Sequence, residues 1–598
     1  MNKHRWQLPL GMFLVLAGSI SGQPGPAAPA GVVRFPADKA TGVNPDTHLV
    51  ITFPSAPVLG KAGRIRIYDA ADDKLIDTLD LSIPPGPSSG VAGGEAAPYT
   101  PVPYEYVSGR LTNANTVPGT PSGVAVATPA TYQLTIIGGF TDAFHFCPVI
   151  IHGNVATIYP HNNLLDYGKT YYVQIDPGVL ALTDGSFTGM SGKAGWTFST
   201  KKNPPPADSA RIVVSADGTG DFNTVQGAVD FVPDRNPTRT TIFIRNGLYE
   251  EIVYFRNKTN ITFLGEDRDK VQVFYANNEV FNPHPPNVAT NEWPGTFPSR
   301  RAAFMADHSS GIHLVNFTVK TTARGQAEGL LLVGGQNIVS NVTIVGSGDA
   351  LQVNDSAYLT DSLIVGDGDT ILGRGPAFFN ACEFNSRGVY TWTRNTSANH
   401  GTVFLNCRFK TLGNGVTEIA RAPTNRGRNY PNAEVVLINC ALSGISPVGW
   451  GTVGGDTSNV HYWEYNSTTV SDGRPVDVSQ RHPASRQLTM EKDAPTIATY
   501  SSPTWVLGGW TPTMAPLILT QPAAATAAPG QTATFSVKVA AIPAATYQWF
   551  KKGAAIHGAT GATLRLDNVR AGDAAEYAVT ATNGSGTATS RAAALKVK

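Results

Sequence analysis

The chain has 598 residues, which is too long for one hydrophobic core and predicts roughly three to four domains. Lys and Arg (45) nearly balance Asp and Glu (44), so no overall field would attract nucleic acid or an anionic membrane. Charged residues make up only 15%, whereas glycine (61) and proline (43) are abundant, which favours strands and tight turns and predicts an all-β protein.

The first 22 residues have the form of a secretory signal peptide. Basic residues at 3–5 precede an apolar run at 8–17, and small residues follow at 19, 21 and 22. The apolar run is too short to span a bilayer, and no later stretch reaches about 18 uninterrupted apolar residues. We therefore expect the mature protein to be secreted to the periplasm or the extracellular space, without a membrane anchor.

Residues 31–200 are expected to form an N-terminal β-sandwich. Strand-like runs at 48–53 and 64–68 lead to a closing run at 196–200, a pattern that resembles the bacterial immunoglobulin-like modules of secreted enzymes. A Pro/Gly-rich stretch near 84–103 is predicted to be a loop within this domain. Residues 201–209 contain three consecutive prolines and predict a stiff linker.

Residues 210–513 repeat a short apolar strand pattern. The repeat positions are separated by 25, 20, 20, 25 and 33 residues, and β-branched strands alternate with Gly/Asn turns, which together predict a β-solenoid. An Asn or Asp precedes most of these positions and predicts a side-chain ladder along one edge. The repeat positions are Phe317, Val342, Ser362, Cys382, Cys407 and Cys440, and the ladder residues are Asn316, Asn341, Asp361, Asn406 and Asn439.

The same repeat bears on the cysteines. Four cysteines in an exported chain could form disulfides. Cys382, Cys407 and Cys440, however, occupy one position of successive repeats, whereas Cys147 lies outside them. We therefore favour free thiols in the core of the solenoid over disulfides.

Two aspartates occupy equivalent places in consecutive repeats. Asp349 lies seven residues after Val342, and Asp369 lies seven after Ser362. Stacked parallel strands are about 4.8 Å apart, so the two carboxylates should be neighbours. Two carboxylates this close do not ionise independently, which can provide an acid and a nucleophile near neutral pH. From these residues alone, turn-capping aspartates and a calcium site remain alternatives to catalysis.

Residues 516–598 are expected to form an immunoglobulin-like sandwich. Trp549 has the place of the buried tryptophan of the third strand, and Tyr577 has the place of the tyrosine corner. Val537 and Val579 stand where the inter-sheet disulfide would be. We expect this domain to be stabilised by packing alone and to act as a spacer or adhesive module.

The segment 210–513 resembles the pectin methylesterase family in the order and spacing of its motifs. Two of them are similar to the G-x-Y-x-E and D-F-I-F-G signatures of that family. In chain order the matching segments are Val214-Ser215-Ala216-Asp217-Gly218-Thr219-Gly220-Asp221-Phe222, Gly247-Leu248-Tyr249-Glu250-Glu251, Gln326-Ala327, Asp349, Asp369-Thr370-Ile371-Leu372-Gly373, Arg421, Ile445-Ser446-Pro447-Val448-Gly449-Trp450 and Leu507-Gly508-Gly509-Trp510.

This resemblance implies a right-handed parallel β-helix that hydrolyses the methyl esters of pectin (homogalacturonan) to pectate and methanol. It implies that Asp369 is the nucleophile and that Arg421 holds it ionised. Gln326 would donate to the oxyanion, and Asp349 would be the acid and then the base. No metal or organic cofactor is implied.

The expected partner is pectin or a related plant cell-wall polysaccharide, bound by a monomer. Candidate substrate-binding residues are Trp450, Arg374 and Gln352.

Three positions depart from the family pattern. The glutamine that normally precedes the acid/base aspartate is Gly348, with Gln352 as a possible substitute, and the tryptophan two residues after the motif arginine is Pro423. The motif at Asp369 also lacks two phenylalanines. These departures keep two alternatives open: an esterase of the same fold acting on a different acyl ester or polysaccharide, and a noncatalytic glycan-binding or adhesive protein.

Overall fold

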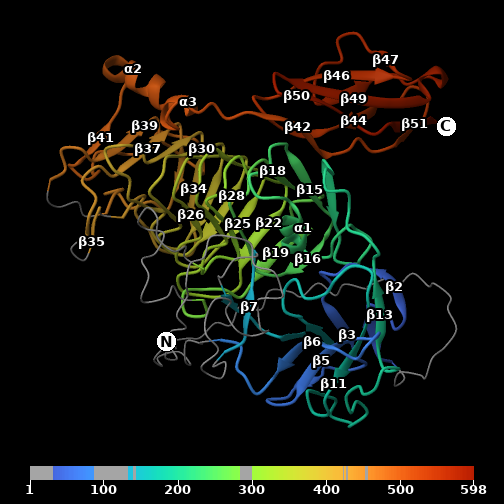
Figure 1. The fold of residues 1–598 in the computed structure, drawn as a ribbon. Coiled ribbons are helices and arrows are strands. Elements are labelled where there is room, and N and C mark those ends of the chain that lie inside the picture. Colours follow the sequence, from blue (N-terminus) through green and yellow to red (C-terminus); the bar gives the residue numbers. More distant parts are fainter. Residues whose placement is uncertain are drawn as a thin grey trace.

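The computed structural model describes residues 31–86, 132–138, 143–282, 300–421, 423–425, 428–451 and 456–598. The expected signal peptide and most of the loop expected near residues 84–103 lie outside this part of the chain. A long stack of parallel strands lies between two smaller β units (Figure 1). The described secondary structure is nearly all β, as predicted. None of the helices in these ranges has the length and apolar character needed to span a bilayer.

The N-terminal unit is a β-sandwich. Its two main sheets have the orders β1-β3-β10-β9 and β2-β13-β11-β5-β6, and they enclose a core that includes Ile51, Val173 and Trp196. The strands of this unit are β1 (Val33–Phe35), β2 (Ala40–Val43), β3 (Leu49–Thr52), β4 (Val58–Leu59), β5 (Arg64–Asp69), β6 (Leu75–Asp80), β7 (Leu134–Ile136), β8 (Ala143–His145), β9 (Val149–His152), β10 (Val155–Ile158), β11 (Thr170–Ile175), β12 (Leu180–Ala181) and β13 (Thr197–Thr200).

The central unit is a parallel β-helix with three long sheets of eleven, nine and six strands. The eleven-stranded sheet contains β14 (Arg211–Val214), β15 (Thr240–Ile244), β18 (Ile261–Gly265), β21 (His313–Val315), β24 (Asn337–Ser340), β27 (Ala357–Thr360), β30 (Ala377–Asn380), β33 (Thr402–Leu405), β37 (Glu434–Ile438), β39 (His461–Tyr465) and β41 (Ser485–Gln487). The nine-stranded sheet contains β16 (Gly247–Glu250), β19 (Val271–Tyr275), β22 (Thr318–Thr321), β25 (Thr343–Val345), β28 (Leu363–Gly366), β31 (Glu383–Ser386), β34 (Arg408–Thr411), β38 (Ala441–Ser443) and β40 (Thr468–Thr469). The six-stranded sheet contains β17 (Val253–Arg256), β20 (Phe304–Asp307), β23 (Leu330–Leu332), β26 (Leu351–Val353), β29 (Ile371–Gly373) and β32 (Thr391–Thr393). Two further elements are the hairpin β35 (Thr424–Asn425) and β36 (Arg428–Asn429) and the helix α1 (Val225–Phe231).

The repeat register predicted from the sequence is confirmed. Each of the six repeat positions immediately precedes a strand of the nine-stranded sheet, from β22 to β38, and these strands pair in the same order. Cys382, Cys407 and Cys440 therefore stack inside the solenoid as buried free thiols. Apart from Ser362, the inward row is apolar, because each coil buries this position against the coils above and below it.

The polar ladder is also present, at the bend before the nine-stranded sheet. Asn316, Asn341, Asp361, Asn406 and Asn439 all have a positive φ, between 52° and 65°, which asparagine and aspartate tolerate better than most residues. The Nδ2 of Asn341 donates to Oδ1 of Asn316 at 2.6 Å, and Asn439 donates to Asn406 at 3.5 Å. The ladder is broken at Ala381, which has the same backbone conformation but no polar side chain.

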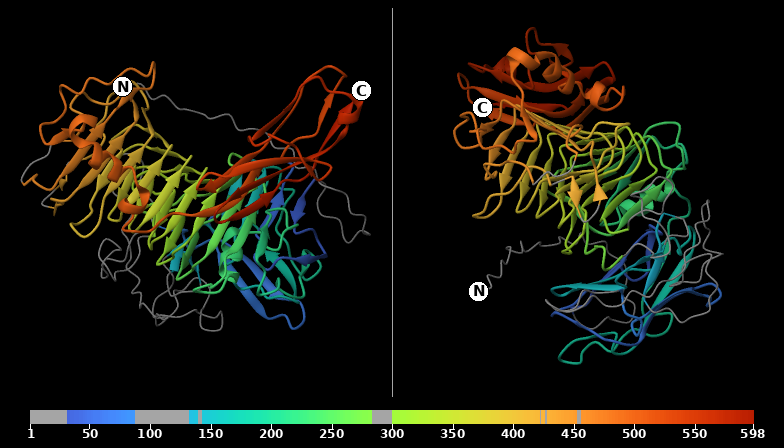
Figure 2. Two further views of the ribbon diagram at one scale, coloured as in Figure 1. Left: turned by 90° about the horizontal axis from the view of Figure 1, so that it is seen from above. Right: turned by 90° about the vertical axis from the view of Figure 1, so that its left-hand side faces the viewer.

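The C-terminal elements cover the outer face of the eleven-stranded sheet. Helices α2 (Met490–Tyr500) and α3 (Pro503–Val506) and the first strands of the C-terminal sandwich contribute Ile497, Val506, Met514 and Ile542 to one apolar cluster with that face. Figure 2 shows the C-terminal unit alongside the stack, opposite the N-terminal unit. This unit is therefore packed on the solenoid, which the expectation of a spacer did not anticipate.

The C-terminal unit has the two predicted marks of an immunoglobulin sandwich. Trp549 is fully buried, and the hydroxyl of Tyr577 donates to the carbonyl of Asp573 at 2.9 Å. Its elements are β42 (Met514–Thr520), β43 (Ala525–Ala527), β44 (Ala533–Ser536), β45 (Lys538–Ile542), β46 (Thr546–Lys551), β47 (Ala554–Ala555), β48 (Thr563–Leu566), the short helix η2 (Ala571–Asp573), β49 (Ala575–Asn583), β50 (Gly586–Thr589) and β51 (Ala593–Val597).

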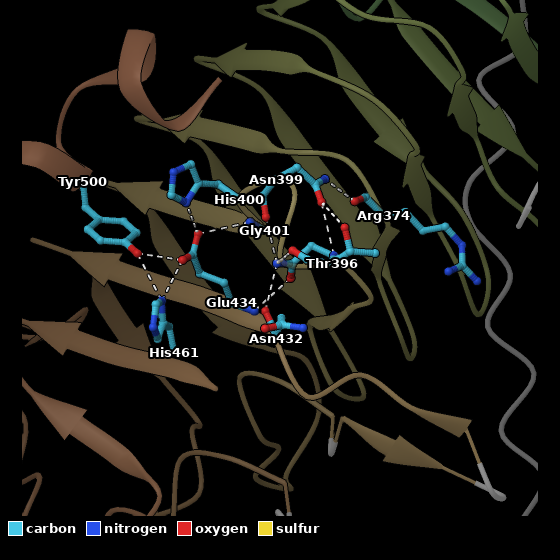
Figure 3. Close-up of polar contacts among 10 residues, drawn as sticks. Arg374, Thr396, Asn399, His400, Gly401, Asn432, Glu434, His461 and Tyr500 are labelled. Carbon is cyan, nitrogen blue, oxygen red and sulfur yellow. Dashed lines mark hydrogen bonds and ion pairs between the residues drawn. The ribbon is translucent and has the colours of Figure 1, made fainter. Parts of the chain in front are cut away.

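A buried carboxylate fastens α2 to the solenoid. Oε1 of Glu434 accepts hydrogen bonds from Nδ1 of His400 at 2.9 Å and from the backbone N–H of Gly401 at 3.1 Å. Oε2 accepts from Nδ1 of His461 at 2.8 Å and from the hydroxyl of Tyr500 at 2.6 Å (Figure 3). Sequence reasoning missed this cluster, because its members come from two strands, the segment before β33 and a helix.

Glu434 is expected to make the stability of the protein depend on pH. Burial alone would raise its pKa, but hydrogen bonds from His400, His461 and Tyr500 lower the pKa to about 2, from an ordinary 4.5. A lowered pKa stabilises the fold above pH 4.5, and this contribution is lost as the pH falls towards 2. It amounts to about 3 kcal/mol. Urea unfolding should show that the difference in the free energy of unfolding between the parent and Glu434→Gln becomes smaller from pH 6 to pH 3. A difference that stays constant over this range would contradict the assignment.

Candidate active site

Asp349 and Asp369 lie at the same place on consecutive coils of the solenoid. Strand β25 pairs with β28 and β26 pairs with β29, each with a shift of 20 residues, so the turns that carry the two aspartates are equivalent. Each aspartate stands two residues before a strand of the six-stranded sheet. The charge of Asp369 contributes to the raised pKa of Asp349, which places the carboxylates within electrostatic reach. The register that the sequence predicted is confirmed.

Asp369 is paired with Arg421. Nη1 of Arg421 donates to Oδ2 of Asp369, whose side chain is 17% exposed. The Arg421 guanidinium also lies 4.7 Å from the ring centroid of Trp392 on the six-stranded sheet. Burial raises the pKa of Asp369, while Arg421 and then Arg394 oppose that rise. Oδ1 of Asp369 is buried without a hydrogen-bond partner among the described residues, so no donor there occupies its lone pairs.

Asp349 has an arginine of its own, which sequence reasoning missed. Nη2 of Arg301 donates to Oδ2 of Asp349 at 2.8 Å, and the same guanidinium is bound by the fully buried Glu328. Burial raises the pKa of Asp349 to about 7; Arg301 opposes this rise, and Glu328 and Asp369 add to it. A carboxyl group with this pKa can donate a proton and accept it back near neutral pH.

Gln326 lies on the preceding coil, next to the turn that leads to Asp349. The backbone of Ala327 exchanges two hydrogen bonds with Ser347, which fixes this segment against the turn that leads to Asp349. The Gln326 carbonyl accepts from the N–H of Glu279 at 2.9 Å. No hydrogen bond joins its exposed side-chain amide to another residue of the described ranges, so the amide can bind a ligand.

The glycine that replaces the expected glutamine is required by its turn. Gly348 has a φ of 69°, and a Cβ at this position would lie 2.6 Å from the carbonyl oxygen of Gly325. Its N–H donates to Oδ1 of Asp367. A glutamine cannot take this backbone conformation without displacing the Gly325 backbone, so the missing side chain follows from the local fold.

Gly348→Ala is expected to destabilise the solenoid and to disturb the segment of Gln326. The left-handed conformation alone costs about 1–2 kcal/mol for an alanine, and the contact with Gly325 adds to this cost. Thermal unfolding should show a lower midpoint for Gly348→Ala. The matched control is Gly415→Ala, because Gly415 has open space around its Cβ position. Equal midpoints for the two variants would contradict the role of the turn.

The expected substrate-binding residues do not all lie at the site. Gln352 faces the same way as Trp392 on the six-stranded sheet, but it is 2% exposed and its Nε2 donates to Asn354 at 3.2 Å. Arg374 follows β29 directly, and its guanidinium lies 5.7 Å from the ring of Tyr430. It is partly exposed, at the end of β29 opposite to Asp369.

Trp450 was expected to bind substrate, and the structure shows this prediction to be wrong. The residue is 1% exposed and stacks on Tyr462 inside the solenoid core, with the ring centroids 4.8 Å apart. A side chain in this position fills the interior of the coils and cannot touch a polysaccharide on the outer face. Trp392 is the tryptophan that lies beside Arg421 instead.

No cluster of three or more His, Cys, Asp or Glu side chains that could hold a metal ion occurs in the part of the chain that the structure describes.

Two parts of this chain match models of known protein families. Residues 211–500 match the model of the pectinesterase family, and residues 516–597 match that of the immunoglobulin I-set domain. Pectinesterase QRT1 of Arabidopsis thaliana is 29% identical over 302 residues, which are 48% of this chain and 75% of that protein. Probable pectinesterase/pectinesterase inhibitor 42 of the same plant is 27% identical over 273 residues, which are 43% of this chain and 50% of that protein.

This chain spans about half the length of several of the curated relatives that it matches. Among solved structures, pectin methylesterase from carrot is 23% identical, with a TM-score of 0.40 over 50% of this chain and 93% of that one. Pectin methylesterase PemA from Erwinia chrysanthemi is 19% identical, with a TM-score of 0.40 over 52% of this chain and 99% of that one.

Proposed function

Because residues 211–500 form a domain of the pectinesterase family, we propose that this protein is a carboxylic ester hydrolase that converts methyl-esterified pectin to pectate and methanol. One observation carries the proposal: Asp349 and Asp369 stand on consecutive coils, each bound by a different arginine. The reaction needs one carboxyl group that starts as an acid and another that starts as an anion. Different surroundings of the two aspartates are what such a division of roles requires.

In the first step, Oδ1 of Asp369 attacks the ester carbonyl carbon. The electron pair of the carbonyl moves to its oxygen, and the Gln326 amide donates to this oxyanion. When the carbonyl re-forms, the bond to the methoxy oxygen breaks, and the leaving group takes the proton of Asp349 to depart as methanol. The products of this step are an anhydride between Asp369 and the sugar acid, and an ionised Asp349.

In the second step, a water molecule releases the acid. The carboxylate of Asp349 takes a proton from the water as its oxygen attacks the acyl carbon of the anhydride. The bond to Asp369 breaks, its carboxylate is restored beside Arg421, and Asp349 is again protonated. Each residue thus returns to its starting state, and the net reaction consumes one water for each methanol.

The substrate is proposed to lie on the outer face of the six-stranded sheet. Arg374 and Trp392 are the groups proposed to meet it there, the first through a carboxylate of a neighbouring sugar and the second through a ring face. Gln352 stays a weaker candidate because of its burial. We further propose that the protein is secreted and that it acts as a monomer.

Product analysis on two substrates tests this function. We expect methanol and free carboxylates from highly methylated homogalacturonan, without chain cleavage, and no acetate from acetylated xylan. The departures at Gly348 and Pro423 motivate the second substrate. Acetate release without methanol would reassign the enzyme to a different ester, and an unsaturated sugar product would reassign it to elimination chemistry.

A further inference from the structure

Three carboxylates, and not two, are stacked beside the six-stranded sheet. Strands β23, β26 and β29 are aligned so that Leu330, Leu351 and Ile371 are paired. Glu328, Asp349 and Asp369 each stand two residues before these positions and therefore occupy one row on three consecutive coils. An arginine lies at each end of the row: Arg421 binds Asp369, and Arg301 binds both Glu328 and Asp349.

Arg301 contacts two carboxylates of the row and a third, Glu279, outside it. Its Nε donates to Oε1 and Oε2 of Glu328 at 2.8 and 2.9 Å. Its Nη2 lies 2.7 Å from Oε1 of Glu328 and 2.8 Å from Oδ2 of Asp349. Nη1 lies 3.5 Å from Oε2 of Glu279. The Arg301 side chain is 11% exposed and that of Glu328 is fully buried, so neither is placed to touch a polysaccharide.

We propose that Arg301, held by Glu328, is the positioning residue of Asp349. The Arg301 guanidinium donates to Oδ2 of Asp349. The proton that is given to methanol and later taken from water therefore resides on Oδ1 of Asp349. This inference rests on the proposed function. Arg301 itself transfers no proton, since a guanidinium stays charged throughout.

The charged groups around Asp349 determine the direction of the expected effects. Arg301 and Arg394 favour its ionised form, whereas Glu328 and Asp369 oppose it. The contribution of Arg301 outweighs that of Glu328. Removing both charges should therefore make Asp349 a weaker acid, and removing Glu328 alone should make it a stronger one.

The pH dependence of kcat/KM tests the inference. The alkaline limb reports loss of the Asp349 proton in the free enzyme. In the double variant Arg301→Gln/Glu328→Gln this limb should move to higher pH, with KM unchanged. In Glu328→Gln it should move down, and in Arg301→Lys it should stay near that of the parent. A loss of activity with no movement of the limb in any folded variant would overturn the proposal and leave Arg301 with a structural role only.

A second measurement does not depend on activity. The Asp349 carboxyl can be titrated by carbon-13 NMR in the Asp369→Asn background, with and without Arg301→Gln/Glu328→Gln. We expect the titration midpoint to rise in the combined variant, and an unchanged midpoint would overturn the inference. If the parent releases no methanol while this shift is observed, the proposed function fails and the positioning of Asp349 stands.

Discussion

Asp369→Asn is expected to lower kcat by at least about 10²-fold while leaving the protein folded. Asparagine has the shape of aspartate, and its carbonyl can still accept the hydrogen bond of Arg421. The amide, however, cannot attack an ester carbonyl, so no anhydride can form. The residual rate would come from water activated by Asp349 and from the oxyanion donor Gln326.

The control for this prediction is Asp472→Asn. Asp472 is an aspartate of a surface turn, where its Oδ1 accepts from Thr469 and from the N–H of Arg474. We expect this variant to keep the parental kcat. Methanol release and thermal unfolding should be measured for both variants together, and a folded Asp369→Asn with the parental rate would show that the nucleophile is wrongly assigned.

Arg421→Gln is expected to lower kcat/KM by about 10²-fold at neutral pH. Burial already raises the pKa of Asp369, and Arg421 is the strongest of the groups that oppose this rise. Without the guanidinium the pKa climbs further, so a larger fraction of Asp369 is protonated and cannot attack. Because a raised pKa removes the anion from the low-pH side, the loss should be largest in acid and should shrink as the pH increases.

Arg421→Lys separates charge from geometry. A lysine retains the positive charge but not the planar contact with Trp392, so we expect an intermediate rate and little change in the pH profile. The measurement is kcat/KM from pH 5 to pH 9 for the parent and both variants. A loss of equal size at every pH in Arg421→Gln would show that Arg421 does not control the ionisation of Asp369.

The solenoid could be predicted from the sequence because each coil repeats the same local requirement. A buried position, apolar in five of its six occurrences, precedes each strand from β22 to β38 of the nine-stranded sheet, and the residue before it adopts a positive φ. These two constraints were enough to predict the positions of the cysteines, of the asparagine ladder and of the two aspartates. The alignment of Asp349 with Asp369 follows from the register alone, without knowledge of any contact between distant segments.

Contacts between coils of unequal length could not be predicted in the same way. Arg301 precedes its strand by three residues and Glu328 by two, so the repeat did not align them as a pair. Their burial was also unexpected, since charged side chains are seldom buried unless they are paired. A charged residue beside a motif that is otherwise apolar would have been the signal to look for such a partner.

Trp450 shows a second limit of prediction from the sequence. A family-like motif identified the segment but not the direction of the side chain, and the turn after β38 directs the indole into the core, against Tyr462. Burial of so large a side chain stabilises the coil by filling its interior, which is reason enough for a tryptophan there. The hydrogen-bonded cluster around Glu434 was missed because its residues come from four separate segments of the chain.

The most direct test of the central claim is methanol release from highly methylated pectin by purified residues 23–598 in the presence of a chelator. We predict methanol in equal amount to the new carboxylates, at a rate that the chelator does not change and that Asp369→Asn loses. A folded parent protein that releases no methanol would contradict the assignment of pectin methyl esters as substrate. Release that Asp369→Asn retains would contradict the paired-aspartate mechanism.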